Sequence, residues 1–183
     1  MHGTPIQAER TLLDGRRSVA VGLTARRMTA SDLPFLAQVY ASTRIEELAP
    51  VPWSDADKSA FLQSQFQAQH AHYQQYYPNA DWLVTCHSGS DIGRLYVERW
   101  PTQHLIIDIA FLPEHRGKGF GEALLRDLMD EAAAAGKAMS IHVEKHNPAM
   151  RLYRRLGFTT VEDKGVYDLM RWETTPAGVT AAT

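Results

Sequence analysis

The feature that most constrains the fold of this chain is an apolar strand followed by a glycine-rich turn and an amphipathic helix. Residues 104–111 are nearly all apolar, which is typical of a strand buried on both faces. The helix expected over residues 119–135 has one apolar face, and residues 139–143 then alternate in polarity as in a strand. Strand, helix and strand in this order predict a crossover between two parallel strands.

The other elements predict a sheet that is otherwise antiparallel. We expect a strand at 23–28, a helix beginning at Ser31-Asp32, a long helix from Ser54 to about Tyr77, a strand meander over 81–99, a short helix at 148–156 and a hairpin over 158–172. The fold class is therefore α/β of the α+β type. It has a central mixed, mostly antiparallel sheet of about seven strands with one parallel pair, and about four helices.

The length of 183 residues fits one domain, which we place at residues 21–173 between flexible segments at 1–20 and 174–183. No apolar run approaches the roughly 18 residues that span a bilayer, and the first residues carry charges where a secretory signal would be apolar. Cys86 is the only cysteine, so neither an intrachain disulfide nor a cysteine-rich zinc site can form. We expect a cytoplasmic protein without a membrane partner or a metal.

The distribution of charge is more informative than the net charge of -2. Residues 116–155 contain eight Lys or Arg against five Asp or Glu, so this segment could hold a small polyanion. Solvated helix faces explain the same charges without a ligand. Stacking aromatic residues and a docking helix are both missing near residues 151–155, so we expect no nucleic-acid partner.

The glycine-rich turn at residues 113–121 has the properties of an anion-binding loop. Its small side chains allow consecutive backbone N–H groups to point at one anion, and the dipole of the following helix adds to their field. A dinucleotide fingerprint that starts at Gly117 fails because position 122 is Glu, and the chain has no Gly-Lys-Ser/Thr of a P-loop. The pattern that remains is Arg116-x-x-Gly119-x-Gly121 after a strand.

This pattern resembles the acyl-CoA signature of the GNAT superfamily of N-acetyltransferases, Gln/Arg-x-x-Gly-x-Gly/Ala between a central strand and a helix. A second segment, from Asn147-Pro-Ala-Met to Leu-Gly-Phe158, is similar to the second half of the cofactor core of that superfamily. The resemblance is specific over residues 105–158 and loose elsewhere. It implies the GNAT fold, an acetyl-CoA cosubstrate and an acceptor site shaped by the first half of the chain.

The resemblance also implies which residues hold acetyl-CoA. Backbone amides would cradle the pyrophosphate, main-chain groups of the buried strand would pair with pantetheine, and divergence of the strands after Ala110 would admit the thioester. Asn147 would reach the cofactor from the next helix, and it could also cap that helix. The implied cofactor-binding residues are Ile109, Ala110, Phe111, Arg116, Gly117, Lys118, Gly119, Phe120, Gly121, Asn147 and Tyr153.

Tyr153 stands where many GNAT enzymes have the hydroxyl that protonates the departing thiolate. Its alternative role is packing on the inner face of the short helix. Asp108 is our first candidate for the base that deprotonates the acceptor amine, because an acid inside an apolar strand must be used or paired. A paired structural carboxylate is the other explanation. Further candidates for the base are Glu98, His104, His142, Glu144 and water.

These residues predict direct transfer of an acetyl group from acetyl-CoA to a primary amine in a ternary complex. A covalent route through Cys86 is disfavoured because Cys86 and His87 point to opposite faces of a strand. A polyamine, an amino acid, an antibiotic and a peptide amino terminus all remain as acceptors. An acidic cluster could attract a cationic amine, although helix ends explain part of it; its members are Glu46, Glu47, Asp55 and Asp57.

Two other questions stay open at this point. A non-catalytic acyl-CoA-binding regulatory module with the same fold is the alternative to an enzyme, and the intact loop and Tyr153 argue against it. Exposed aromatic residues would suit a homodimer contact; these are Tyr76, Tyr77 and Trp172.

Overall fold

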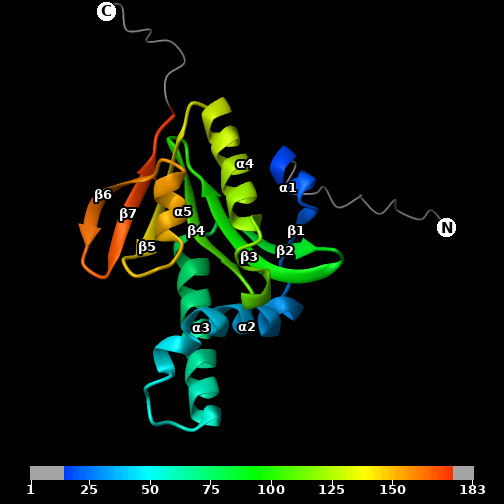
Figure 1. Ribbon diagram of the computed structural model, residues 1–183, viewed down its shortest axis with the longest axis vertical. Helices are drawn as coiled ribbons and strands as arrows, with labels where there is room; N and C mark the ends of the chain where they lie inside the picture. The colour runs from blue at the N-terminus through cyan, green and yellow to red at the C-terminus, as the bar shows by residue number, and fades with distance from the viewer. Residues whose placement is uncertain (1–14, 175–183) are drawn as a thin grey trace, which may run out of the picture.

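The computed structural model describes residues 15–174, in which one seven-stranded sheet carries the fold (Figure 1). The strand order is β1-β2-β3-β4-β5-β7-β6, and only the β4–β5 pair is parallel. This confirms the predicted mixed sheet with one parallel pair. The strands are β1 (Leu23–Arg27), β2 (Asp81–His87), β3 (Ser90–Arg99), β4 (Gln103–Phe111), β5 (Ala138–Glu144), β6 (Thr159–Lys164) and β7 (Tyr167–Trp172).

Five α-helices accompany the sheet, one more than the four expected. They are α1 (Arg16–Ala20), α2 (Leu33–Arg44), α3 (Asp55–Tyr76), α4 (Phe120–Ala134) and α5 (Met150–Arg155). Ser54 caps α3 by accepting a hydrogen bond from the backbone N–H of Asp57, as its position in the sequence predicts. None of these helices is both long and apolar enough to cross a bilayer.

The additional helix, α1, lies at the end of the segment 1–20 that we expected to be flexible. Its N-terminal amides are bound by Asp127 of α4, whose carboxylate accepts hydrogen bonds from the backbone N–H groups of Arg17 and Ser18 at 3.2 and 2.7 Å. A cap supplied from more than a hundred residues away leaves no local sequence signal. Residues 1–14 and 175–183, where the remainder of the expected flexible segments falls, lie outside the described residues.

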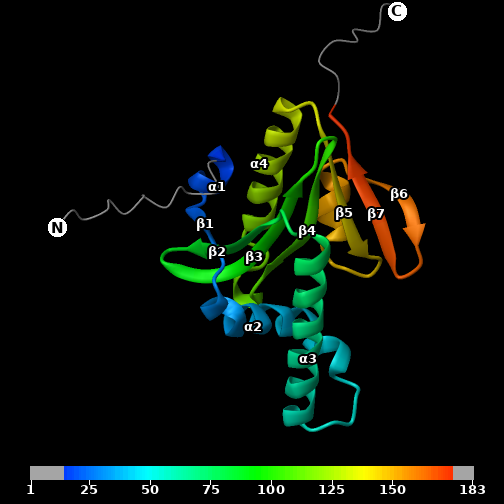
Figure 2. The same ribbon diagram turned by 180° about the vertical axis from the view of Figure 1, so that it is seen from behind.

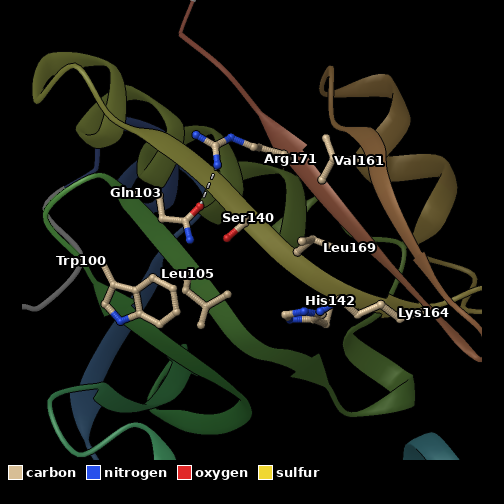
Figure 3. A pocket seen from close by; sticks show the side chains of 9 residues that line it. All are labelled: Trp100, Gln103, Leu105, Ser140, His142, Val161, Lys164, Leu169 and Arg171. Carbon is tan, nitrogen blue, oxygen red and sulfur yellow. Dashed lines mark hydrogen bonds between the residues drawn. The ribbon is translucent and has the colours of Figure 1, made fainter.

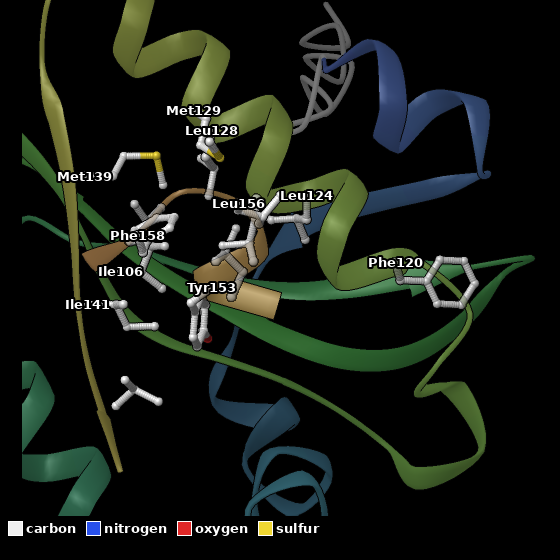
Figure 4. Packing of buried hydrophobic residues seen from close by; sticks show 14 of the residues in the cluster. Ile106, Phe120, Leu124, Leu128, Met129, Met139, Ile141, Tyr153, Leu156 and Phe158 are labelled. Atoms are coloured by element: carbon white, nitrogen blue, oxygen red, sulfur yellow. The ribbon is translucent and has the colours of Figure 1, made fainter. Parts of the chain in front are cut away.

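Helices cover the two faces of the sheet unequally (Figures 1 and 2). On one face, α4 and α5 pack against the sheet through the largest core cluster, which includes Leu124, Leu128, Ile141 and Phe158 (Figure 4). On the other face, α2 and α3 bury a smaller cluster around Phe66. The first half of α3 extends past the sheet in both views.

A β-bulge interrupts the regular pairing of β4 with β3. Tyr96 of β3 pairs with Asp108, and the next residue, Val97, pairs with Ile106, so Ile107 is an extra residue in β4. Such a β-bulge changes the alternation of side chains along its strand. Leu105 and Asp108 consequently face the same side of the sheet, although their positions differ by three, which in a regular strand would put them on opposite sides.

Candidate active site

The site is built around a gap between β4 and β5. The two strands pair from Gln103–Ala138 to Ile106–Ile141 and then part. Beyond that point β4 continues beside β3, and β5 continues beside β7. The expectation that the strands part after Ala110 is wrong. The bulge at Ile107 directs β4 away from β5 four residues earlier.

The glycine-rich loop lies at the N-terminus of α4, one end of the gap. The backbone N–H groups from Gly117 to Glu122 donate no hydrogen bond to another described residue. Gly117 and Gly119 have φ angles of 69° and 84°, and a Cβ atom at either position would meet no atom within 4 Å. The loop thus presents a run of unsatisfied donors and the positive end of a helix to open space, which fits a pyrophosphate.

The side chains of Arg116 and Phe120 make contacts outside this loop. Arg116 Nε donates to the carbonyl oxygen of Phe111 at 2.8 Å, and its Nη2 donates to the Ser42 hydroxyl at 2.9 Å. Arg116 therefore ties the end of β4 to α2 instead of reaching into the loop. Phe120 is buried in the core, and Lys118 is exposed. Recognition by this loop would come from its backbone.

Asn147 precedes α5 and shapes the turn that leads into it. Its Oδ1 accepts a hydrogen bond from the backbone N–H of Ala149 at 2.9 Å, and its carbonyl oxygen accepts one from Met150. The helix itself begins at Met150 with Ala149 in the N-cap position, so Asn147 bonds the turn before the helix and does not occupy the cap position considered from the sequence. The Asn147 side chain amide nitrogen is not used in that contact.

Tyr153 reaches the gap from α5. Its ring packs against Phe158 at a centroid distance of 5.8 Å, and Figure 4 shows its hydroxyl oxygen at the end that points away from Leu124 and Leu156. Burial raises the pKa of Tyr153, and the negative charge of Asp108 raises it further. The hydroxyl therefore stays protonated at neutral pH, as a proton donor must.

Asp108 lies on the opposite side of the sheet from Tyr153 and is held by a buried arginine. Arg94 Nη2 donates to Asp108 Oδ2 at 2.6 Å, and the exposed fractions of the two side chains are 2% and 15%. The Arg94 guanidinium also lies over the rings of Tyr40 and Tyr96, at 5.9 and 5.4 Å from their centroids. Burial opposes its charge, but Asp108 keeps the pKa of Arg94 above its usual value. The acid predicted to need a partner has one.

The other candidate bases are divided between the two faces and the two ends of the site. Glu98 accepts a hydrogen bond from Trp100 Nε1 at 2.7 Å, beside the part of β4 that remains paired with β5. His104 is buried 3.9 Å from Glu131 on the α4 side, away from Asp108. Burial lowers its pKa.

Two of the candidates border the gap on the same side as Asp108. His142 is the first residue of β5 after the paired section, and partial desolvation and the charge of Lys164 lower its pKa. Glu144 ends β5 and accepts hydrogen bonds from Arg44 and from the Tyr167 hydroxyl. The bond from Arg44 lowers the pKa of Glu144.

Cys86 lies apart from the gap, on β2. Its thiol donates to Asp91 Oδ1 at 3.1 Å, and burial together with that carboxylate raises its pKa to about 11. Its neighbour His87 faces the other side of the sheet, where its ring contacts Phe120. This arrangement gives Cys86 no thiolate character at neutral pH.

Sequence reasoning missed two residues of the site. Arg94 is the partner of Asp108, and Tyr73 of α3 has its pKa raised by burial and by the charge of Asp108. The signal for Arg94 was present in the sequence, because it is the one charged residue among the inner residues of the predicted strand Ile92–Val97, as Asp108 is in its own strand. Two opposite charges inside adjacent antiparallel strands predict an ion pair.

Comparison with known proteins agrees with this geometry. The structure of the PaiA N-acetyltransferase from Thermoplasma acidophilum in complex with coenzyme A superposes with a TM-score of 0.63 at 16% identity, over 82% of this chain and 98% of that chain. This likeness shows that the two chains share a fold.

Two curated proteins match shorter stretches. The L-methionine sulfoximine/L-methionine sulfone acetyltransferase of Salmonella typhimurium is 49% identical over 49 residues, which are 26% of this chain and 29% of that protein. The streptothricin acetyltransferase of Streptomyces lavendulae is 41% identical over 61 residues, which are 32% of each chain. The matched stretches thus span about a third of these relatives or less.

The family model described as "Acetyltransferase (GNAT) family" matches residues 43–158, a segment that contains the glycine-rich loop, the gap, Asp108 and Tyr153. On this match, which covers more than half of its length, the chain belongs to the GNAT family of acetyltransferases.

Proposed function

We propose that this protein transfers an acetyl group from acetyl-CoA to the nitrogen of a primary amine by direct attack in a ternary complex. The observation that supports the proposal is the end of β4–β5 pairing at Ile106–Ile141, with Asp108 just beyond it on one face of the sheet and Tyr153 in the core on the other face. Acetyl-CoA, when bound, supplies an activated acetyl thioester. The residues of the chain bind it, orient the amine and move protons.

In this proposal the backbone amides of the loop from Gly117 to Gly121 hold the pyrophosphate. The unpaired edge of β4, at Ile109 and Ala110, holds the pantetheine arm as an added strand would be held. Phe111 contributes less, because its carbonyl oxygen already accepts a hydrogen bond from Arg116. Asn147 contacts the cofactor from the turn before α5.

Two proton transfers complete the reaction. As the nitrogen–carbon bond forms, Asp108 accepts a proton from the amine, directly or through water. As the carbon–sulfur bond breaks, Tyr153 donates its hydroxyl proton to the departing sulfur. Asp108 is preferred to His142 because it lies in β4 just beyond the last residue that pairs with β5, on the same strand that is proposed to hold pantetheine. Arg94 fixes the position of the carboxylate.

The acceptor we propose is a small molecule. The names of the two curated relatives give L-methionine sulfoximine, L-methionine sulfone and streptothricin as the molecules they acetylate. Arg44, Glu144 and Tyr167 form a hydrogen-bonded bridge between α2, β5 and β7 at the end of β5 beyond its paired section.

The experiment that tests the function is a screen for the release of free thiol from acetyl-CoA across amine classes, with amine-free reactions as the baseline. Amine-dependent thiol release that is lost in a Tyr153→Phe variant would support an acetyltransferase. Binding of acetyl-CoA by calorimetry, without thiol release for any amine, would favour the non-catalytic binding module instead.

A further inference from the structure

A hollow on the open face of the sheet lies next to the gap. Its volume is about 200 Å³. Leu105, Ser140 and Leu169 form its floor from three neighbouring strands, and Trp100 and Val161 stand at its sides (Figure 3). Pockets for drug-sized ligands measure roughly 300–1,000 Å³, so this hollow suits a smaller molecule or one end of it.

The hollow contains a polar group that lacks a partner. The Ser140 side chain is buried, with 3% of the residue exposed, and its hydroxyl oxygen forms no hydrogen bond within residues 15–174. Beside it, Gln103 Oε1 accepts a hydrogen bond from Arg171 Nη1 at 3.3 Å. Because buried hydroxyl groups are nearly always hydrogen-bonded, Ser140 indicates that a ligand or a water molecule completes this surface.

The charges around the hollow favour an anion. Lys164 and Arg171 line it, and none of the residues that line it is acidic. The buried Glu98, which pairs with Leu105, accepts a hydrogen bond from Trp100 Nε1. Two carboxylates pair with these cations from outside: Glu173 accepts from Arg171 Nε, and Glu162 lies 3.4 Å from Lys164. Both carboxylates are largely exposed, so water screens them. Arg171 Nη2 has no hydrogen-bond partner among the described residues and remains available to a ligand.

The distance between the hollow and the gap sets the length of that ligand. Ser140 pairs with Arg171 across the β5–β7 ladder, and His142 pairs with Leu169. His142 is also the residue at which the gap begins. Two residues along a strand correspond to about 7 Å, which is the backbone separation of these two pairs, so a ligand held in the hollow must span at least about 7 Å to bring an amine to the mouth of the gap.

We infer that the acceptor is an amine that carries a carboxylate at least about 7 Å from its nitrogen, bound in the hollow by Arg171 with Ser140 and Lys164. This inference rests on the proposed function. A singly charged carboxylate fits better than a phosphate, because each cation already shares its charge with one glutamate. The carboxylate would accept hydrogen bonds from Arg171 Nη2 and from the Ser140 hydroxyl, and Trp100 and Leu105 would cover the apolar segment that joins it to the amine.

The test compares kcat/KM for acetyl transfer to glycine, γ-aminobutyrate and ε-aminohexanoate, with n-hexylamine as the matched amine without a carboxylate. We expect ε-aminohexanoate to exceed both glycine and n-hexylamine by about tenfold or more, since a hydrogen bond to a charged group contributes about 1.5–3 kcal/mol. Equal values for ε-aminohexanoate and n-hexylamine would overturn the inference and leave the proposed function standing. Absence of thiol release with every amine class would overturn both.

Three variants test whether the preference for ε-aminohexanoate over n-hexylamine depends on the residues of the hollow. Arg171→Gln should bring the ratio of the two kcat/KM values close to one, mainly through a higher KM for ε-aminohexanoate. Arg16→Gln removes the same charge from α1 on the far side of α4 and should leave the ratio unchanged. Lys164→Gln serves as a second variant in case Arg171→Gln lowers the melting temperature. Because the Lys164 side chain is half-exposed, its replacement should leave the fold intact and lower the ratio of the two kcat/KM values several-fold. An unchanged ratio in both Arg171→Gln and Lys164→Gln would refute the assignment.

Discussion

Arg94 Nη2 donates a hydrogen bond to Asp108 Oδ2 at 2.6 Å, from the strand next to the one that parts from β5. The arginine is almost fully enclosed, and its Nε and Nη1 atoms have no partner among the described residues. Asp108 is therefore its main charge partner, and the two residues depend on each other. A change at Asp108 affects both the fold and the chemistry, which makes the design of variants important.

Asp108→Asn tests these two effects separately. The variant leaves the buried Arg94 charge without its partner, so we expect the melting temperature to fall, because breaking a buried pair costs about 3–5 kcal/mol. The rate at neutral pH should also fall, and this defect should shrink as pH rises, since more of the acceptor is then already deprotonated. A pH–rate profile parallel to that of the wild type would remove Asp108 from the reaction and make His142 the next candidate.

Arg94→Gln combined with Asp108→Asn serves as the control for that variant. The double variant removes both charges, and we expect it to recover part of the stability that Asp108→Asn alone loses. Its rate should stay as low as that of the single variant if the carboxylate is the proton acceptor. Differential scanning calorimetry and steady-state kinetics on the same samples give the two measurements.

Tyr153→Phe should reduce kcat by roughly 10²-fold or more and leave the affinity for CoA within a few-fold. The ring that contacts Phe158 is kept, so the melting temperature should hardly change. If kcat is retained, the hydroxyl has only a structural role, and another group or water protonates the sulfur.

The pH dependence of wild-type kcat provides a check without mutation. Burial raises the pKa of Tyr153 above its usual value of about 10, so the proton donor stays protonated throughout the alkaline range in which an ordinary tyrosine begins to ionise. We expect kcat to show no alkaline decline up to about pH 10. A decline centred near pH 8 or 9 would contradict this role for Tyr153.

Gly119→Glu should abolish CoA binding measured by titration calorimetry, because it places a negative side chain in the open space above the loop. Gly136, after the other end of α4, offers a matched control. It also has a positive φ, 64°, and a Cβ atom there would likewise meet no atom within 4 Å. Gly136→Glu should cost similar stability, about 1–2 kcal/mol, and leave CoA affinity unchanged. Equal affinity in both variants would show that the pyrophosphate binds elsewhere.

The parts of the fold that could be predicted from the sequence are those with local signals. The apolar run of β4, the apolar face of α4 and the Gly157 stop of α5 each act within one turn or one strand, and the structure has them at the expected positions. The glycine-rich loop was found for the same reason. Its function depends on backbone conformation, which glycine spacing indicates directly. The start of α5 was expected two residues too early, because the turn at Asn147 precedes the helix.

The remaining parts depend on contacts between distant residues. Asp127 caps α1 from another helix, and the bulge at Ile107 appears only when β4 is aligned with β3. The hollow was missed because its floor comes from β4, β5 and β7, whose neighbouring positions are far apart in the chain. Side-chain alternation within one strand cannot reveal which strand lies next to it.

The bulge at Ile107 has a consequence for how such a protein could change its substrate. The hollow is built on the section of β4 that stays hydrogen-bonded to β5, and Asp108 stands on the section beyond it, yet both face the same side. If the hollow binds the acceptor and Asp108 accepts its proton, as proposed, replacing side chains before the bulge would alter which molecule is recognised without moving the residues proposed to react. The proposal thus makes recognition and reaction separately adjustable along one strand, so that an engineer could redesign the first while keeping the second.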